Sequence, residues 1–368
     1  MSKRIQRIQV KTAYASYPIV IGMNIERELV NVVKKEGANR RVAVISDGTV
    51  ARLIATRIVS VLKKNGLKTE LFTFPAGEKN KNQQIVTKLQ HAMLKRKYGR
   101  DSLIVALGGG VTGDMAGFVA ATYMRGIPYI QVPTTLLAMV DSSVGGKVGI
   151  DTPFGKNTVG AFWQPKAVIA DAAHLRHLSR KELISGLIEA VKTFFTSDRH
   201  MLAVAQRLDL DDPFRTANEL QAIIYRSISI KAAIIGRDER ESAERLVVNF
   251  GHTIGHAIEL LSEFRMPHGY AVGYGILVES KIAELLGTIS SDEYVSIRDH
   301  LKRFGITKAP LSKFSIARVL HVAKTDKKSK SGVPHYVLLS SIGSVYTKGG
   351  VYAYPVKESI VRKAYRTV

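Results

Sequence analysis

Cysteine is absent from this chain of 368 residues, and tryptophan occurs once. The lack of cysteine excludes disulfides, thiolate nucleophiles and cysteine-ligated zinc, so any bound metal must be held by histidine, aspartate or glutamate. No apolar run approaches the roughly 20 residues that span a bilayer. The N-terminal MSKRIQRIQV is basic but lacks the apolar region and cleavage site of a secretion signal. The sequence therefore predicts a cytoplasmic protein without a membrane partner.

Acidic residues are scarce beside basic ones: 31 Asp and Glu stand against 54 Lys and Arg, a net charge of +23. Such a charge is typical of nucleic-acid binders. The basic residues, however, are spread along the chain, and helix-turn-helix, RNP and zinc-finger patterns are missing. A generally basic surface explains the charge better than specific nucleic-acid binding, and an anionic small-molecule substrate would account for part of it.

Strand-like and helix-like segments alternate in the first half of the chain. The predicted strands are the β-branched runs at 41–47, 67–74, 101–110, 127–133 and 166–171, and the predicted helices lie at about 50–65 and 80–98. This alternation is typical of a parallel sheet with crossover helices. We therefore expect an α/β domain with a Rossmann-like sheet over residues 1–178.

The pattern changes at about residue 179, where segments with a period of 3.6 begin to dominate. The predicted helices lie at 180–196, 213–237, 241–263, 269–287 and 291–304, and 335–347 is a predicted hairpin. These segments indicate a second, mostly α-helical domain over residues 179–368.

The glycine-rich stretch GGGVTGD (108–114) follows a predicted strand and opens a predicted helix. Gly108, Gly110 and Gly113 fit the G-x-G-x-x-G spacing, in which a helix N-terminus receives a pyrophosphate. The motif lies on a later strand than the first, unlike the usual Rossmann arrangement. A glycine-rich turn that needs positive φ angles stays open as the alternative to a dinucleotide site.

Other polar residues follow the predicted strands, where open α/β folds bind their ligands. Asp47 is a candidate ribose ligand, and Glu78 and Lys81 are placed to reach the same cleft. Further along come Thr134, Thr135, Lys147, Lys156 and Asn157, the last three in glycine-containing segments that we expect to be loops aimed at an anion. The alternative is that these lysines are merely solvated.

Two histidines lie four residues apart in VVNFGHTIGHAIE (247–259). A zinc-protease signature would carry glutamate after the first histidine, where this chain has Thr253. On one helix over 241–263, a continuous stripe would contain Glu241, Arg245, Asn249, His252 and His256. The alternative, a solvated face, is usually made of Glu and Lys rather than Asn and His.

Ionisable residues in neighbouring predicted helices can join this stripe. Glu189 and Lys192 lie three apart in an apolar segment, where unpaired charges are costly. His268 lies near the start of the next predicted helix, and Lys231 lies one helix upstream. One carboxylate and two imidazoles from three helices would make a catalytic zinc site with an open position.

Taken together, these motifs resemble those of the 3-dehydroquinate synthase family, one of the sugar-phosphate cyclases. The resemblance covers nearly the whole chain and is densest in GGGVTGD, MRGIPYIQVPTTLLAMVDSSVGGKVGI, GKNTVGAFWQPKAVIAD, DERES, NFGHTIGHAIE and DKK (326–328). It implies an NAD-binding α/β domain (1–178), a helical metal- and substrate-binding domain (179–368) and a homodimer.

The family converts 3-deoxy-D-arabino-heptulosonate 7-phosphate to 3-dehydroquinate and phosphate in the shikimate pathway of aromatic amino acid biosynthesis. The resemblance therefore implies NAD and Zn²⁺ or Co²⁺ as cofactors. It also implies a phosphate-eliminating lyase that works by transient oxidation, phosphate loss, re-reduction and intramolecular aldol closure.

The resemblance also assigns roles to individual residues of this chain. The implied metal ligands are Glu189, His252 and His268. The implied NAD site consists of Asp47, Glu78, Lys81, Gly109, Gly110, Val111, Gly113, Asp114, Thr134, Thr135, Lys147 and Lys156. The implied substrate site consists of Asp141, Lys147, Asn157, Lys192, Lys231, Arg245, Asn249, His256 and Lys327 or its neighbour Lys328, with Arg125 reaching the phosphate site of a partner subunit.

The chain departs from the family pattern at three places. Tyr270 replaces the glutamate of the usual HGE, Ala243 stands where glycine is common, and EAVKT replaces EVIKY or EVIKH. These departures leave room for a sister cyclase that makes an inosose or a valiolone. A metal-dependent polyol or glycerol-phosphate dehydrogenase of similar architecture is a second alternative.

Overall fold

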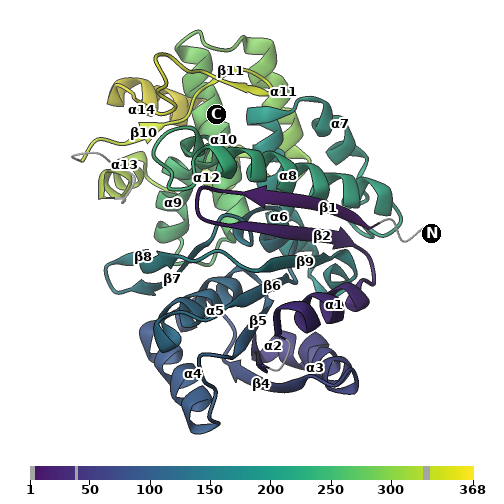
Figure 1. The fold of residues 1–368 in the computed structure, drawn as a ribbon. Coiled ribbons are helices and arrows are strands. Elements are labelled where there is room, and N and C mark those ends of the chain that lie inside the picture. The colour runs from purple at the N-terminus through teal and green to yellow at the C-terminus, as the bar shows by residue number, and fades with distance from the viewer. Residues whose placement is uncertain (1–4, 38–39, 326–331) are drawn as a thin grey trace. The chain divides into compact units, whose positions relative to one another are not determined.

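The protein is described here by a computed structural model, which covers residues 5–37, 40–325 and 332–368. The chain divides into two compact units, Met1–Leu178 and Ser179–Val368 (Figure 1). Within the described ranges, no helix has both the length and the apolar character needed to cross a membrane.

The first unit is built on a seven-stranded sheet in the order β1-β2-β9-β6-β5-β3-β4. β1 pairs with β2 in antiparallel fashion, and the remaining neighbours are parallel. The strands are β1 (Gln6–Lys11), β2 (Ser16–Gly22), β3 (Arg41–Asp47), β4 (Lys68–Phe74), β5 (Leu103–Gly108), β6 (Tyr129–Pro133) and β9 (Ala167–Asp171). A separate antiparallel hairpin joins β7 (Lys147–Thr152) and β8 (Gly155–Phe162).

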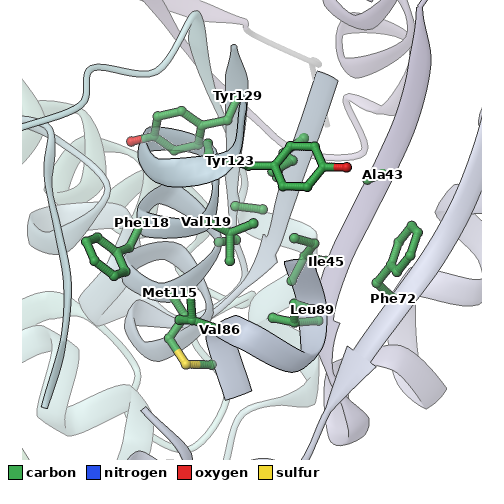
Figure 2. Packing of buried hydrophobic residues seen from close by; sticks show 14 of the residues in the cluster. Ala43, Ile45, Phe72, Val86, Leu89, Met115, Phe118, Val119, Tyr123 and Tyr129 are labelled. Atoms are coloured by element: carbon green, nitrogen blue, oxygen red, sulfur yellow. The ribbon is translucent and has the colours of Figure 1, made fainter. Parts of the chain in front are cut away.

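Helices cover both faces of this sheet. They are α1 (Glu26–Gly37), α2 (Gly48–Val50), the π-helical turn η1 (Ala51–Ala55), α3 (Thr56–Lys64), η2 (Glu78–Asn80), α4 (Gln83–Lys95), α5 (Gly110–Thr122), η3 (Tyr123–Arg125), η4 (Ala138–Ser142) and η5 (Ala172–His177). Along β3, Val42 and Val44 pack with residues of α1 and α3, whereas Ala43 and Ile45 pack with residues of α4 and α5 (Figure 2). Burial on both faces explains why the strands are continuous apolar runs.

The second unit is mostly helical. Its elements are α6 (Arg180–Ser197), α7 (His200–Arg207), α8 (Ala217–Arg237), η6 (Glu244–Asn249), α9 (His252–Leu261), α10 (His268–Leu285), α11 (Ser291–Lys302), α12 (Lys308–Leu311), α13 (Ile316–Thr325), β10 (His335–Tyr336), β11 (Leu339–Ser341), β12 (Ser344–Val345), β13 (Tyr354–Pro355) and α14 (Glu358–Thr367). A capping box of Ser179 and Glu182 begins α6, because each side chain bonds the other's backbone N–H. The prediction of an α/β part followed by a mostly helical part is confirmed.

Three local predictions are wrong. The helix expected over 241–263 is interrupted, because Gly251 has φ +77° and a left-handed residue cannot continue a right-handed helix. Glu241, Arg245 and Asn249 therefore do not share one helical stripe with His252 and His256.

The other two errors concern strands. Lys147, Lys156 and Asn157 lie in the β7–β8 hairpin rather than in loops, since the glycines there allow two backbones to approach closely. The hairpin expected over 335–347 is limited to β11 and β12, because β10 pairs with β13 instead.

Candidate functional site

The carboxyl edge of the parallel strands collects many of the residues expected to bind NAD. Asp47 ends β3, Glu78 and Lys81 follow β4, and Thr134 and Thr135 follow β6. Neighbouring parallel strands end at the same edge, so the sheet brings these residues to one side of the first unit.

The glycine motif forms the start of α5, as the dinucleotide interpretation requires. Gly109 is the N-cap and has no side chain, so the N–H groups of the first turn are not capped by a side chain. That turn contains Gly110, Val111 and Gly113, and Asp114 follows it. A Cβ at Gly109 would lie 3.0 Å from Cγ2 of Thr135, so a larger residue would crowd this approach.

Polar groups around this turn are partly committed to structure. The Asp47 carboxylate caps α2 by accepting from the N–H of Thr49 and Val50, and it also accepts from the Thr112 hydroxyl at 3.3 Å. The Thr134 hydroxyl, by contrast, is buried and has no hydrogen-bond partner among the described residues. An unsatisfied buried hydroxyl beside an uncapped helix N-terminus fits a polar, phosphate-containing ligand such as a dinucleotide.

Lys81 is the centre of a buried polar cluster at the same edge. Its ammonium donates to Asp114 Oδ2 and to Asn157 Oδ1, both at 2.5 Å. Burial disfavours the ammonium, but Asp114, Glu78 and Asp151 outweigh that effect and raise the pKa of Lys81. Lys81 therefore carries a fixed positive charge.

Asp151 belongs to this cluster and was missed in the sequence. It accepts from the N–H of Asn157 at 2.8 Å, and its own N–H donates to the carbonyl of Lys81 at 2.8 Å. Burial raises the pKa of Asp151, although the Asn157 N–H and Lys81 oppose the shift. Nearby, the Lys156 ammonium pairs with Glu78 at 3.2 Å. The sequence did offer one signal for Asp151, because it lies between the two glycine-lysine segments that contain Lys147 and Lys156.

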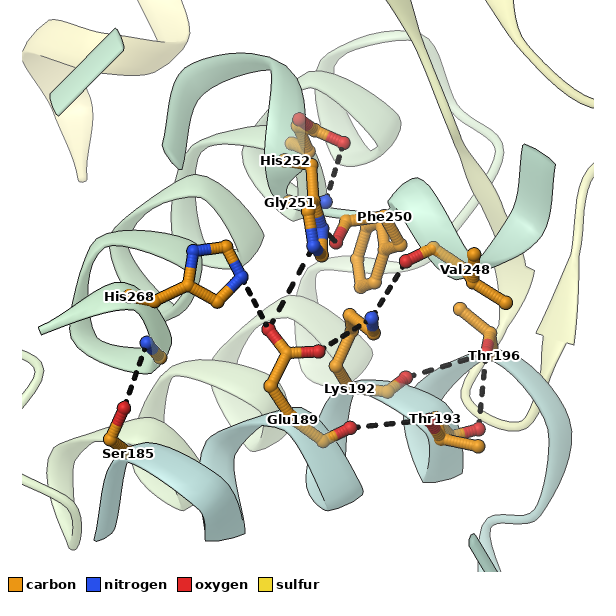
Figure 3. A network of polar contacts seen from close by, with 12 residues as sticks. Ser185, Glu189, Lys192, Thr193, Thr196, Val248, Phe250, Gly251, His252 and His268 are labelled. Atoms are coloured by element: carbon orange, nitrogen blue, oxygen red, sulfur yellow. Dashed lines mark hydrogen bonds and ion pairs between the residues drawn. The ribbon is translucent and has the colours of Figure 1, made fainter. Parts of the chain in front are cut away.

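The second unit holds a candidate metal centre. Glu189 of α6, His252 of α9 and His268 of α10 each offer one ligand atom, and these atoms lie within 4.8 Å of one another (Figure 3). Glu189 Oε1 is 3.9 Å from His252 Nε2 and 3.6 Å from His268 Nε2. Ligands of a tetrahedral zinc ion lie about 3.4 Å apart, given bonds of about 2.1 Å.

The donor atoms also fit a metal chemically. The Glu189 carboxylate has no exposed surface, and neither of its oxygens has a hydrogen-bond partner in the described chain. A buried carboxylate of that kind is costly unless a cation compensates it. The Lys192 ammonium, 2.6 Å from Glu189 Oε2, supplies one positive charge, and Oε1 faces the two imidazoles. One carboxylate with two imidazoles is a donor set that suits zinc and cobalt.

The other residues expected around the substrate lie on several elements of this unit. Lys192 donates to the carbonyl of Val248 at 2.7 Å, which ties α6 to η6 (Figure 3). Asn249 donates to Glu241 at 2.8 Å, and Arg245 is buried and donates to the carbonyl of Glu239. Lys231 is buried in α8.

His256 adjoins the metal centre without belonging to it. Its ring lies 5.3 Å from that of His252 and 6.0 Å from that of His268, measured between centroids. The group of three ligand atoms does not include it. The two histidines of the VVNFGHTIGHAIE stretch therefore have different surroundings.

The remaining predicted residues lie on several other elements or positions. In the first unit, Asp141 is in η4, Lys147 is exposed at the start of β7, and Arg125 is exposed in η3 with φ +67°. Lys327 lies outside the described residues. Tyr270, which replaces the usual glutamate, is on α10, and burial raises its pKa.

Three buried carboxylates of the second unit were also missed. Asp238 accepts from the N–H groups of Ser242, Ala243 and Arg245 and so shapes the turn before η6. Glu259 lies 3.1 Å from Nδ1 of His268, and Glu279 accepts from the N–H of Gly251. Glu259 could have been found, because it follows His252 by seven residues, which is two helical turns.

Comparison with known proteins agrees with these features. Residues 71–185 match the family model described as 3-dehydroquinate synthase N-terminal, and residues 186–329 match the one described as 3-dehydroquinate synthase C-terminal. The 3-dehydroquinate synthase of Caldanaerobacter subterraneus subsp. tengcongensis is 40% identical over 343 residues, which are 93% of this chain and 96% of the relative. That of Vibrio atlanticus is 39% identical over 364 residues, which are 97% and 98% of the two chains.

A solved structure is similar over almost the same extent. It is 2-deoxy-scyllo-inosose synthase complexed with carbaglucose-6-phosphate, NAD⁺ and Co²⁺, with a TM-score of 0.88 and 26% identity. The match covers 98% of this chain and 99% of that one. The two family models together match residues 71–329, and the relatives cover more than 90% of the chain, which belongs to the 3-dehydroquinate synthase family.

Proposed function

We propose that this protein is a 3-dehydroquinate synthase, which converts 3-deoxy-D-arabino-heptulosonate 7-phosphate to 3-dehydroquinate and phosphate. The observation that carries the proposal is the group of Glu189, His252 and His268 in a chain that is 40% identical to a relative of that name. The enzyme is a phosphate-eliminating carbon–oxygen lyase of the shikimate pathway.

The cofactors of the proposed reaction are NAD and a divalent cation, Zn²⁺ or Co²⁺. The related inosose synthase was solved with NAD⁺ and Co²⁺, and the donor atoms described above fit both groups. When bound, NAD supplies a reversible hydride acceptor and the cation supplies a Lewis acid. Glu189, His252 and His268 would hold the cation, and the start of α5 with Asp47, Thr134 and Thr135 would hold the dinucleotide.

The cationic residues of the second unit would bind the anionic substrate. Lys192, Lys231 and Arg245 are all buried, and buried cations recognise phosphate and carboxylate groups strongly. Lys192 is fixed by Glu189 and by the Val248 carbonyl, so little side-chain entropy is lost when a ligand binds. Asn249, fixed by Glu241, would orient a substrate hydroxyl.

His256 would move a proton during phosphate loss. It lies beside the metal centre but is not one of its ligands, so its ring nitrogens need not be given up to a cation. Histidine suits this role because its ordinary pKa is close to neutral pH.

The assembly and location of the enzyme also belong to the proposal. A homodimer would bring the exposed Arg125 of one subunit to the phosphate site of the other, and the backbone at Met124 and Arg125 already takes positive φ angles. Such angles in non-glycine residues concentrate at functional sites. The cytoplasm is the proposed compartment.

A sister cyclase is the second candidate, because the inosose synthase has a TM-score of 0.88 with this chain and Tyr270 departs from the usual family residue. The deciding experiment incubates the protein with the heptulosonate phosphate, NAD and Zn²⁺ or Co²⁺, and follows inorganic phosphate and the product by NMR. We expect phosphate and 3-dehydroquinate in equal amounts and no net NADH.

The controls use a chelator, omission of NAD, and two histidine variants. His252→Ala should abolish phosphate release, whereas His321→Ala, at an exposed position of α13, should not change it. Turnover of glucose 6-phosphate in place of the heptulosonate phosphate would favour the sister cyclase. Accumulated NADH would indicate a dehydrogenase, and salt-sensitive DNA or RNA binding without turnover would indicate a nucleic-acid binder.

A further inference from the structure

The helices α9 and α10 approach each other unusually closely beside the metal centre. A Cβ on Gly275 would lie 1.8 Å from the carbonyl oxygen of Gly251, and one on Gly255 would lie 3.0 Å from Cα of Val272. The pairs come in opposite chain order, Gly251 with Gly275 and Gly255 with Val272, so the two helices run antiparallel. Only glycine permits backbones to approach to this distance.

Two buried carboxylates link these helices at their opposite ends. Glu259 of α9 lies with Oε2 3.1 Å from Nδ1 of His268, the first residue of α10. Glu279 of α10 accepts with Oε2 from the N–H of Gly251 at 2.9 Å, one residue before His252. Glu259 is 5% exposed and Glu279 is fully buried, so solvent screens neither contact strongly.

Each carboxylate therefore acts on the other helix. Glu259 of α9 contacts the candidate ligand His268 on α10, and Glu279 of α10 contacts the backbone at the start of α9, next to His252. The geometry points to Glu259 and Glu279 as reciprocal positioning residues, which hold His268 and His252 in register for a divalent cation before the cation binds. The inference rests on the metal site of the proposed function and goes beyond its three ligands.

The imidazole contacts show how the positioning works. Both histidines turn Nε2 toward Glu189 Oε1 (Figure 3). The Nδ1 atom of each ring has a contact of its own. Nδ1 of His252 lies 3.1 Å from the carbonyl of Phe250, and Nδ1 of His268 meets Glu259. An acceptor at Nδ1 keeps the proton there and leaves the Nε2 lone pair for a metal.

The two histidines differ in what meets Nδ1. At His252 it is the backbone carbonyl of Phe250, and the start of the helix is held by Glu279. At His268 it is the side chain of Glu259. Loss of Glu259 should therefore affect metal binding more selectively, whereas loss of Glu279 should also disturb the helix crossing.

The test measures metal affinity rather than turnover. Co²⁺ and Zn²⁺ are titrated into metal-free protein against a chromogenic chelator, and the visible absorption of the Co²⁺ form is recorded. The variants are Glu259→Ala, Glu259→Gln and Glu279→Gln. The matched control is Glu263→Gln, an exposed carboxylate four residues from Glu259 that pairs with Arg265.

We expect Glu259→Ala to weaken metal binding about 10- to 100-fold and to change the Co²⁺ spectrum. Glu259→Gln keeps a neutral acceptor for Nδ1 and should recover part of the affinity. Glu279→Gln should weaken binding and also lower the melting temperature of the metal-free protein. Glu263→Gln should behave as the unmodified protein in all three measurements.

The outcomes distinguish a failure of the positioning role from a failure of the metal site itself. If Glu259→Ala lowers the melting temperature but leaves the affinity and the spectrum unchanged, its role is structural and the inference is overturned. If the unmodified protein itself binds neither metal, the metal site of the proposed function fails first. Should Glu259→Ala not fold, the comparison of Glu259→Gln with Glu263→Gln still decides, because equal affinities and spectra would again overturn the inference.

Discussion

Replacement of Gly275 by alanine adds one carbon atom at the closest point between α9 and α10. That Cβ would lie 1.8 Å from the oxygen and 2.7 Å from the carbon of the Gly251 carbonyl, and 2.9 Å from the Gly255 nitrogen. All three atoms belong to backbone, so no side chain can turn aside. Contacts of a Cβ shorter than 3.0 Å essentially do not occur, and the helices must therefore separate by at least 1.2 Å at this point, the difference between 3.0 and 1.8 Å.

The displacement has two consequences of predictable size. Overpacking typically costs about 1–3 kcal/mol, and a rigid backbone clash belongs at or above the upper end, which is about 6–12 °C in melting temperature for a unit of this size. Because Gly251 adjoins His252, the shift also moves one metal ligand relative to His268. Metal sites tolerate deviations of only about 0.2 Å, so metal affinity should fall by at least about 10-fold.

The matched control is Gly273→Ala, two residues earlier on α10. Its Cβ would lie 2.9 Å from the Cδ1 and Cγ1 atoms of Ile306, which belong to a side chain that can move. Thermal unfolding of the metal-free proteins and competitive Co²⁺ titration would be compared for both variants. If Gly275→Ala is as stable as Gly273→Ala and binds Co²⁺ equally well, the account of this helix crossing is refuted.

Three further predictions concern single charged or titratable groups. Lys81→Met should lower the free energy of unfolding by about 3 kcal/mol and abolish NAD binding, because it leaves Asp114 without its buried cation; the exposed Lys79→Met is the control for urea unfolding and calorimetric NAD titration. Asp238→Asn should cost about 2 kcal/mol at pH 7: burial opposes the shift, but backbone N–H donors hold the pKa of Asp238 below its ordinary 3.8, so the native advantage is present above pH 3.8 and is lost as the pH falls through the lowered pKa. Urea unfolding of both proteins at pH 7 and pH 3 should show the difference shrinking, and an unchanged difference would contradict it. His256→Ala should reduce phosphate release by about 10²- to 10⁴-fold with Co²⁺ affinity changed less than about threefold, and an equally large loss of affinity would make His256 a ligand instead.

The sequence was a good guide wherever one physical rule governed a long segment. Strands of the first unit are buried on both faces, so they are apolar runs, and β3 was predicted with its observed bounds, Arg41–Asp47. The helices α6 and α8 repeat apolar residues at a period of 3.6 over many turns, which reveals them in the same way.

Prediction failed where a contact with a distant segment outweighs the local pattern. The apolar residues of 241–263 repeat with a helical period throughout, yet the helix is interrupted at Gly251. The backbone of Gly251 must pack against Gly275, 24 residues later. Glu279 escaped notice for a similar reason, since its partner, Gly251, lies 28 residues earlier and meets it only through the fold. Sequence spacing identifies residues that share a face, but it does not show which faces meet.

The charges around Glu189 support the separate roles proposed for the two histidines of VVNFGHTIGHAIE. Glu189 and Glu259 contribute two formal negative charges beside the imidazoles, and Lys192 contributes one positive charge, so the centre carries −1 by itself. A divalent cation held by His252 and His268 changes this sum to +1. The cation thus changes the contribution of this centre from repelling an anionic substrate to attracting it. If His256 were a ligand as well, its imidazole would add no charge and could no longer transfer a proton. A single metal shared by both histidines would therefore serve the proposed chemistry less well.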